Sequence, residues 1–352
     1  MSADNAVNRG KETEEKNMSD KKEVVVVTGA SAGLGRAIAV AFARRGASVG
    51  LIARGGAGMD GLEGAKKDVE AAGGKALILP CDVADHAQVE EAAQKAEDEF
   101  GPIDVWVNDA MTSVFGPVKE INPDDFKRVT EVTYLGQVYG TMAALKRMLP
   151  RNHGHIVLVG SALAYRGIPL QSAYCGAKHA IQGFADSLRA ELLHDKTEVK
   201  LCMVQMPAMN TPQFEWVKNL LPNKPQPVPP IYQPEVAAEA VYWAAHHDRR
   251  EIFVGSSTDI AILGNKLFPQ VGDWYLGRTG FKSQQRPNQP KDPNTPNNLY
   301  DALPGDRTAH GPFDDKAKSF SPQLWLSLNR KPVLAALGLA GLAAWAALGR
   351  KE

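Results

Sequence analysis

Short runs of Val, Ile and Leu alternate with longer stretches of helical pattern from Glu23 to about Gly255. Several of these runs are almost continuously apolar, which is typical of parallel strands that helices cover on both faces. The pattern predicts strands at 24–27, 48–53, 76–79, 103–107, 155–159, 199–204 and 251–254. It predicts helices at 34–45, 60–72, 86–100, 124–149, 173–193 and 234–246. This alternation indicates a single α/β domain with a doubly wound parallel sheet.

Charge and cysteine content exclude some classes of partner and compartment. The chain has 352 residues, and its 40 Lys and Arg balance 40 Asp and Glu. Because phosphate binding needs a basic excess on some face, nucleic acid is not expected as a partner. The cysteines, Cys81, Cys175 and Cys202, are odd in number in a chain too large to need disulfides, which favours a reducing compartment. No histidine pair has a metal-site spacing, so no metal is expected.

Three segments lie outside the α/β domain, which we expect to cover residues 23–280. Residues 1–22 are polar and contain no signal-peptide core, which predicts a disordered leader. Residues 281–322 are rich in Pro, Asn, Asp and Gln, as in a polar linker or a surface-wrapping extension. Residues 323–352 then predict a hydrophobic C-terminal helix.

The most apolar part of that helix, residues 333–348, has basic residues on both sides. A helix of this length reaches about 24 Å, short of the roughly 30 Å hydrocarbon core of a bilayer. Trp345 and the basic flanks suit a membrane interface, whereas the alternative is a terminal helix packed on the domain or on a partner. We expect a cytoplasmic location, with residues 333–348 as the candidate contact with the cytoplasmic face of a membrane.

The first predicted strand leads into a glycine-rich turn, Thr28-Gly-Ala-Ser-Ala-Gly-Leu-Gly35, and then directly into a helix. Glycines in this position allow a tight turn and let a pyrophosphate approach the N–H groups at the start of the helix. The turn therefore predicts a dinucleotide site in a Rossmann-like fold.

The end of the second strand indicates which dinucleotide is bound. An acidic residue there would accept hydrogen bonds from both ribose hydroxyls, but this chain has Arg54 and no acid. Since a guanidinium can form two parallel bonds with a phosphate, Arg54 favours NADP(H) over NAD(H). The alternative is a solvated arginine.

Three residues predict proton chemistry. Tyr174 and Lys178 are four residues apart in a helical pattern, so they lie on one helix face. An ammonium near a phenol stabilises the phenolate and lowers the tyrosine pKa toward neutrality. Ser161 closes a strand, where catalytic groups tend to lie in open α/β sheets.

These motifs, together with Asp82-Val83 and Asn108 after the third and fourth strands, resemble the short-chain dehydrogenase/reductase family over roughly residues 23–255. The resemblance implies that Tyr174 is the general acid/base, that Ser161 binds the substrate oxygen, and that Lys178 binds the nicotinamide ribose and tunes Tyr174. It implies homo-oligomers that pair through the long helices 124–149 and 173–193. The expected cofactor residues are Gly29, Ser31, Ala32, Gly33, Leu34, Gly35, Arg54, Asp82, Val83, Asn108, Tyr174 and Lys178.

The chain departs from the family pattern at several positions. Asp109 and Met111 replace a usual asparagine and glycine, and Thr133 replaces an asparagine that often holds a water in a proton relay. Ala208 replaces a turn glycine, and Thr211 arrives about one residue early, so it is not included among the predicted site residues.

The sequence as a whole predicts an NADP(H)-dependent reductase or dehydrogenase that acts on a carbonyl or alcohol group. The pocket walls are expected from 162–172, from the region after Pro207 and from a proline-rich arm at 221–234. An apolar small-molecule substrate suits the side chains these segments offer: Tyr165, Ile168, Leu170, Met209, Phe214 and Trp216. The alternative is an NADP(H)-binding sensor or scaffold with weak or no catalysis, docked by its C-terminal helix.

Overall fold

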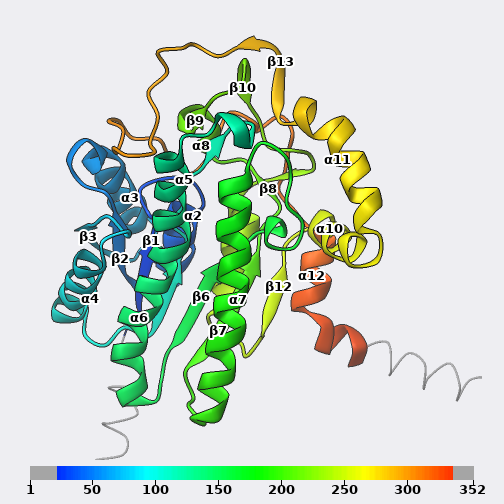
Figure 1. Cartoon of the computed structure of the whole chain (residues 1–352). Helices are drawn as coiled ribbons and strands as arrows, with labels where there is room; N and C mark the ends of the chain where they lie inside the picture. Colours follow the sequence, from blue (N-terminus) through cyan, green and yellow to red (C-terminus); the bar gives the residue numbers. More distant parts are fainter. Residues whose placement is uncertain (1–21, 336–352) are drawn as a thin grey trace, which may run out of the picture.

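A computed structural model describes residues 22–335 of the chain. Its centre is a parallel sheet of seven strands in the order β12-β7-β6-β4-β1-β2-β3 (Figure 1). The strands are β1 (Val24–Thr28), β2 (Ser48–Ala53), β3 (Lys75–Pro80), β4 (Val105–Asn108), β6 (His155–Val159), β7 (Lys200–Gln205) and β12 (Glu251–Phe253). The strand order reverses direction at β1, so the predicted doubly wound, Rossmann-like α/β fold is confirmed.

Helices cover both faces of this sheet. They are α2 (Gly33–Ala43), α3 (Met59–Ala71), α4 (His86–Phe100), α5 (Pro123–Thr130), α6 (Gly136–Met148), α7 (Ser172–His194) and α9 (Pro234–Ala244). Alternate side chains of each strand face opposite sides, so Val25 and Val27 pack in a core with α2, α3 and α9, whereas Val24 and Val26 pack with α4, α6 and α7. Two apolar cores therefore stabilise the sheet, one on each face, and the polar site lies at the carboxyl ends of its strands.

The predicted helix 124–149 is interrupted. Between α5 and α6 the chain forms one π-helical turn, η3 (Glu131–Leu135). The Thr133 hydroxyl inside this turn donates to the Thr112 carbonyl at 2.8 Å and accepts from the Thr112 N–H at 3.0 Å. The turn thus fixes the loop after β4, next to the cavity described below.

Shorter elements lie between these helices and strands. The helical turns are η1 (Gly56–Gly58), η2 (Val118–Glu120), η4 (Leu149–Arg151), η5 (Ala162–Ala164) and α8 (Gln213–Trp216). Three small sheets pair β5 (Val114–Phe115) with β9 (Lys218–Asn219), β10 (Asn223–Pro225) with β13 (Gln285–Pro290), and β11 (Ile231–Tyr232) with β8 (Ala208–Met209) and β14 (Ala317–Lys318). The proline-rich arm supplies β10 and β11, so it pairs with segments from the C-terminal third of the chain.

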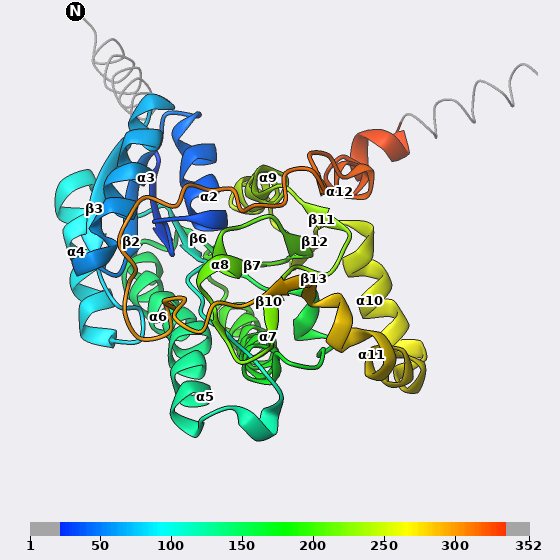
Figure 2. The ribbon, with the colours of Figure 1, turned by 90° about the horizontal axis from the view of Figure 1, so that it is seen from above.

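After β12 come the helices α10 (Ser256–Leu267), α11 (Pro269–Ser283) and α12 (Pro322–Leu328). Residues 291–316, between β13 and β14, form a segment that we call the strap. Figure 2 shows the strap crossing the carboxyl ends of the strands and returning toward α12. The strap bonds to the domain: Arg54 donates to the Asn298 carbonyl, and Arg36 pairs with Asp306.

The ends of the chain lie outside the description. The predicted leader, except its last residue, and most of the apolar stretch 333–348 belong to the residues that the structure does not describe. Among residues 22–335, no helix is both long and apolar enough to cross a bilayer.

Candidate active site

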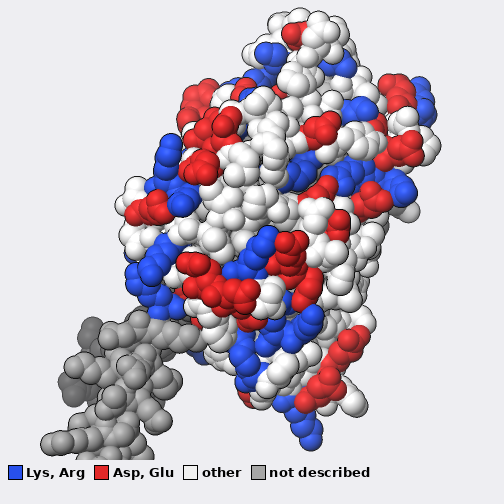
Figure 3. Space-filling model, turned by 90° about the vertical axis from the view of Figure 1, so that its left-hand side faces the viewer, with Lys and Arg blue, Asp and Glu red and all other residues white. Residues whose placement is uncertain are grey.

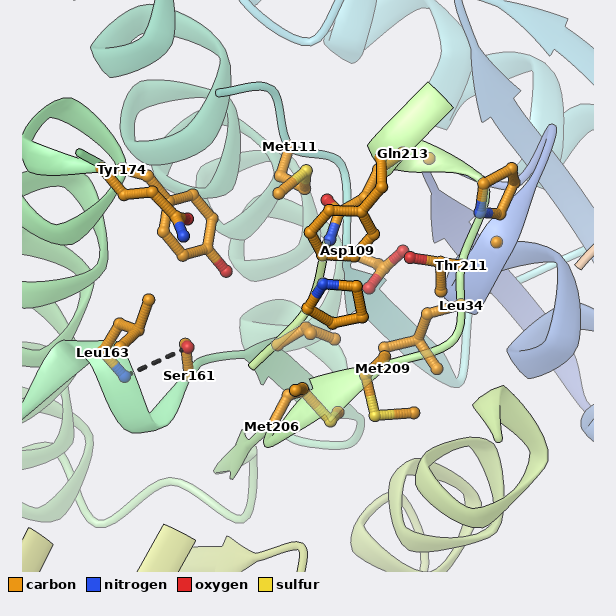
Figure 4. A pocket seen from close by; sticks show the side chains of 18 of the residues that line it. Leu34, Asp109, Met111, Ser161, Leu163, Tyr174, Met206, Met209, Thr211 and Gln213 are labelled. Atoms are coloured by element: carbon orange, nitrogen blue, oxygen red, sulfur yellow. Dashed lines mark hydrogen bonds between the residues drawn. The ribbon is translucent and has the colours of Figure 1, made fainter. Parts of the chain in front are cut away.

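A cavity of ≈ 480 Å³ lies at the carboxyl ends of β1, β4, β6 and β7, and Ser161, Tyr174 and Lys178 all line it (Figure 4). Ser161 follows β6, and its hydroxyl accepts the Leu163 N–H at 3.1 Å, which caps the turn η5. Tyr174 and Lys178 lie in the first two turns of α7. The sheet edge and one helix therefore bring the three predicted catalytic residues together.

Lys178 is fixed from behind by the sheet. Its side chain is 1% exposed, and Nζ donates to the Val159 carbonyl at 2.6 Å. Burial lowers its pKa, and the nearby Asp109 carboxylate opposes that change. Nζ lies 5.6 Å from the centre of the Tyr174 ring, so the amine is close to the aromatic ring in the same cavity.

Tyr174 differs from the expectation drawn from its spacing to Lys178. Burial raises the pKa of the phenol well above its usual value, and the Ser161 hydroxyl opposes this only in part. In the protein alone, desolvation therefore outweighs the predicted effect of a nearby ammonium. The neutral phenol is favoured, and this is the form that donates a proton to a carbonyl oxygen.

Asp109 places an acid in the site where the family usually has an asparagine. Thr28 ties its backbone to β1, because the Thr28 hydroxyl accepts the N–H groups of Asp109 and Ala110 at 2.9 and 3.0 Å. Burial raises the pKa of the Asp109 carboxyl, while Lys178 and the Gly35 N–H lower it. A buried carboxyl and a buried amine thus face the same cavity, each shifted toward its neutral form.

The glycine-rich turn has the compact geometry expected of it. Gly29 and Gly33 have φ of 75° and 59°, in the left-handed region that favours glycine. A Cβ on Gly35 would lie 2.4 Å from the Gly29 carbonyl oxygen, so Gly35 packs inside the turn. The other predicted turn residues, Gly29, Ser31, Ala32, Gly33 and Leu34, line the cavity.

Arg54 lines the cavity at the end of β2, where it meets the strap. Its guanidinium donates to the Asn298 carbonyl at 2.6 Å and to the Tyr300 carbonyl at 2.7 Å. The Arg54 side chain is therefore not a freely solvated arginine. These two bonds use two of its five N–H groups.

Asp82, Val83 and Asn108 lie at different depths. Asp82 and Val83 line the cavity, and the Asp82 carboxylate is paired with Arg128. Asn108 is fully buried and lies behind the cavity wall: it accepts the Trp106 indole N–H at 2.9 Å and donates to Thr141 at 3.1 Å. Asn108 and Gly35 therefore support the site from the interior instead of facing it.

The structure adds residues that the sequence analysis did not include. Thr211 lines the cavity opposite Gly33, since a Cβ on Gly33 would lie 3.4 Å from the Thr211 Cβ. Arg307 of the strap also lines it and lies over the Trp216 ring, 5.5 Å from the ring centre. Within residues 22–335, no acidic side chain pairs with Arg307.

The strap is held directly over the glycine-rich turn. The Gly33 N–H donates to the Thr308 carbonyl at 2.9 Å, and Asp306 pairs with the buried Arg36 of α2. The polar composition of residues 281–322 gives no sign of this position, because the bonds join residues more than two hundred positions apart in the chain.

The other half of the cavity is apolar. Of the predicted wall residues, Ile168, Met209, Phe214 and Trp216 line it, whereas the Tyr165 hydroxyl donates to Glu251 and Leu170 packs in a separate small core. Further apolar or aromatic lining comes from Met111, Phe115, Leu163, Met206, Val228, Tyr275 and Leu276. Residues 226–230 of the proline-rich arm complete the wall, as expected. No group of three or more His, Cys, Asp or Glu suited to a metal occurs in the part of the chain that the structure describes.

With this geometry established, the comparisons identify the family. The model of the short chain dehydrogenase family matches residues 23–219. The chain belongs to this family and is an oxidoreductase of it, as the sequence resemblance predicted. The strap, α10 and α11 all lie after the matched residues.

Relatives and a solved structure are similar to the chain to different extents. The uncharacterized oxidoreductase YxnA of Bacillus subtilis is 34% identical over 335 residues, or 94% of this chain and 91% of that protein. A 3-dehydrosphinganine reductase of Danio rerio is 37% identical, covering 54% of this chain and 57% of that protein. A fatty acyl-CoA reductase of Acinetobacter baylyi is 31% identical, covering 64% of this chain and 73% of that protein.

Among solved structures, the alcohol dehydrogenase of the archaeon Thermococcus sibiricus, complexed with 5-hydroxy-NADP, is similar with a TM-score of 0.57 and 28% identity. The similarity covers 66% of this chain and 95% of that one.

Proposed function

We propose that the protein is an NADP(H)-dependent oxidoreductase that transfers a hydride between the nicotinamide and the carbonyl or alcohol carbon of an apolar substrate. One observation carries this proposal: the hydroxyls of Ser161 and Tyr174 and the amine of Lys178 meet in the cavity that also contains the glycine-rich turn and Arg54. The donor set fits a dinucleotide, with N–H groups at the start of α2, cations at one end and proton-transfer groups at the other.

The residues of the chain supply the proton and the orientation. A bound nicotinamide supplies or accepts the hydride. In the reducing direction, Ser161 donates a hydrogen bond to the substrate oxygen, and the neutral Tyr174 phenol transfers its proton to that oxygen. Lys178, held by Val159, lies beside the phenolate that remains and stabilises its charge until a proton from solvent restores the phenol.

Two arginines divide the recognition of the cofactor. Arg54, oriented by two strap carbonyls, is proposed to bind the 2′-phosphate, which favours NADP(H). Arg307 lines the same cavity as the start of α2 and is proposed to bind the pyrophosphate there. The cofactor analogue in the similar archaeal alcohol dehydrogenase also supports NADP(H).

The apolar walls support a substrate with an extended hydrocarbon part. Aromatic, Met and Leu side chains from several separate segments line the cavity that contains Ser161 and Tyr174. Two relatives carry the names 3-dehydrosphinganine reductase and fatty acyl-CoA reductase, which denote lipid substrates. We therefore propose a long-chain carbonyl compound or alcohol, and we keep the cytoplasmic location and the homo-oligomer as predictions.

The buried Asp109 favours an alternative, an NADP(H)-binding sensor or scaffold. A carboxyl group in the cavity opposes the negative charge that proton transfer would leave on Tyr174. The experiment that decides between the two functions compares wild type with Tyr174→Phe. NADPH oxidation is followed with aldehydes and ketones of graded chain length, and NADPH affinity is measured by fluorescence.

We expect Tyr174→Phe to lower turnover by about 10²- to 10⁴-fold with NADPH affinity almost unchanged. Tyr242→Phe on α9, outside the cavity, serves as the control and should keep full activity. Tight NADPH binding without turnover of any carbonyl compound would favour the sensor. Preference for small hydrophilic ketones would contradict the apolar substrate.

A further inference from the structure

The helices α10 and α11 expose an unusual number of large apolar side chains. These side chains are exposed by 46% at Phe281 to 71% at Ile260. They are Ile260, Leu263, Leu267, Phe268, Val271, Trp274, Tyr275 and Phe281, which together we call the α10–α11 surface. Because soluble proteins rarely expose contiguous apolar patches of this kind, the surface needs an explanation.

The two helices are oriented with polar contacts toward the domain. Arg166, in the loop before α7, donates to Asn265 of α10 at 3.1 Å and pairs with Asp273 of α11 at 2.7 Å. Asn265 in turn donates to the Tyr165 carbonyl at 2.7 Å. In α11 only Gly280 is buried, and Val271, Trp274 and Phe281 are left exposed. The polar anchors hold this orientation in place.

The α10–α11 surface reaches the mouth of the substrate cavity. Tyr275 belongs to both, and Leu276, Thr279 and Gly280 of α11 also line the cavity. Gly280 allows α11 to lie against the loop before α7, since a Cβ there would come within 2.6 Å of Pro169. An apolar path therefore leads from the exposed helices to the apolar half of the site.

The charged side chains around the surface are of the kinds that bind a membrane interface. Its acidic residues are Asp259 and Asp273, and Asp273 is paired with Arg166. Lys266, Arg278 and Lys282 are the cations of the two helices, and the Arg278 guanidinium lies 4.1 Å from the centre of the Trp274 ring. Aromatic and basic side chains next to an apolar stripe match the headgroup region of an anionic bilayer.

The position of the chain end points to the same side. Figures 1 and 2 both show α10, α11 and α12 together on one side of the molecule, where the described chain ends at residue 335. Leu326 and Leu334 there are exposed by 51% and 66%, and the apolar sequence 333–348 continues from this point. Figure 3 shows the opposite side, where acidic and basic side chains are interspersed.

We propose that the α10–α11 surface docks on the interface of an anionic lipid bilayer, with the mouth of the cavity against the membrane. The docking stands on this surface alone. The entry of substrate from the lipid phase rests, in addition, on the proposed oxidoreductase function. The helices lie in the plane of the interface and do not span the bilayer.

The test uses the full chain with vesicles of phosphatidylcholine alone or mixed with phosphatidylserine, separated by flotation. The variant Val271→Glu/Trp274→Glu changes two side chains of the surface that do not line the cavity. Leu193→Glu, on the highly exposed end of α7, is the matched control. Circular dichroism and NADPH binding establish that each variant is folded.

We expect wild type and Leu193→Glu to float with the anionic vesicles, and the double variant to bind them at least about tenfold more weakly. Equal flotation of all three proteins would overturn the proposal, because the C-terminal sequence would then suffice. A wild-type dimer that the double variant converts to a monomer, with flotation unchanged, would instead assign the surface to a second copy of the chain.

Activity separates the docking from the proposed function. With a short soluble ketone, kcat/KM of the double variant should equal that of wild type. With a long-chain ketone embedded in anionic vesicles, kcat/KM of the double variant should fall by about the same factor as its binding to the vesicles. Loss of flotation without any reductase activity in wild type would retain the docking and reject the oxidoreductase.

Discussion

The central sheet and the strap are stabilised in opposite ways. The sheet buries apolar side chains of neighbouring segments in two large cores, whereas the strap is held by ion pairs and carbonyl bonds, with Leu299 and Phe313 as its buried apolar side chains. Because regions with few buried apolar contacts open at low free energy, the strap should open without unfolding of the sheet. We therefore expect the sheet to set the stability of the protein and the strap to control access to the part of the cavity that is proposed to bind the cofactor.

The largest effect on stability is expected in the sheet. Trp106 is fully buried in the core beside α4 and α6, so Trp106→Ala should lower the free energy of unfolding by about 3–5 kcal/mol. Phe313→Ala in the strap should cost less, because the strap can loosen while the sheet remains folded. Urea unfolding followed by circular dichroism measures both values, and equal losses would contradict the separation of the two regions.

Arg54 and Arg307 line the part of the cavity that is proposed to bind the cofactor, and they should differ in their effect on the choice between NADPH and NADH. Arg54→Ala should weaken NADPH binding by about 10- to 100-fold and NADH binding little, because NADH lacks the 2′-phosphate. Arg307→Ala should weaken both by about tenfold, since the pyrophosphate is common to both. Titrations with both nucleotides check this. Equal losses for NADPH and NADH in Arg54→Ala would reject its assignment to the 2′-phosphate.

Release of the strap from α2 should affect binding more than stability. Asp306→Ala removes one partner of Arg36, which keeps Asp68 at 2.7 Å. We expect faster NADPH dissociation by about tenfold and little change in the unfolding temperature. Asp315→Ala, an exposed acid of the same strap, is the control for stopped-flow measurement of the dissociation rate. Unchanged dissociation would show that the strap does not cover the cofactor.

A further expected effect concerns the pH dependence of stability. The pKa of Asp109 is raised in the folded protein by burial, so the folded state favours the neutral acid and loses stability as pH rises from about 4, the ordinary value in the unfolded chain. Asp109→Asn lacks this loss. The difference in free energy of unfolding between variant and wild type should grow with pH until the raised pKa is passed. A difference independent of pH would contradict the assignment.

The sequence predicted the sheet, and it predicted a site that contains Ser161, Tyr174 and Lys178, because both depend on short-range patterns. Strand 155–159 was predicted at its exact bounds, since its apolar run is covered on both faces. Tyr174 and Lys178 share a helix face by their spacing alone. The π-helical turn at 131–135 could not be predicted, because it depends on bonds between Thr133 and a distant loop.

The cofactor half shows the limit of sequence reasoning. The position of Arg54 follows from its place after a strand, but its orientation depends on the carbonyls of Asn298 and Tyr300, and every residue type provides such a carbonyl. Nothing in composition distinguishes a strap from a linker when its contacts are backbone atoms. The outer face of α10 and α11 also could not be predicted from composition, because the side-chain contacts of Arg166 determine it.

The sequence by itself therefore determined the family, the doubly wound sheet and the glycine-rich turn, and it predicted the chemistry that we propose for Ser161, Tyr174 and Lys178. Hydrophobic periodicity and fixed spacings encode these features locally. Tertiary structure alone decided that the strap lies over the cofactor half, that Asn108 faces the interior, and that an apolar helix surface borders the substrate cavity. These arrangements depend on contacts between distant segments, which form only when the sheet has placed them together.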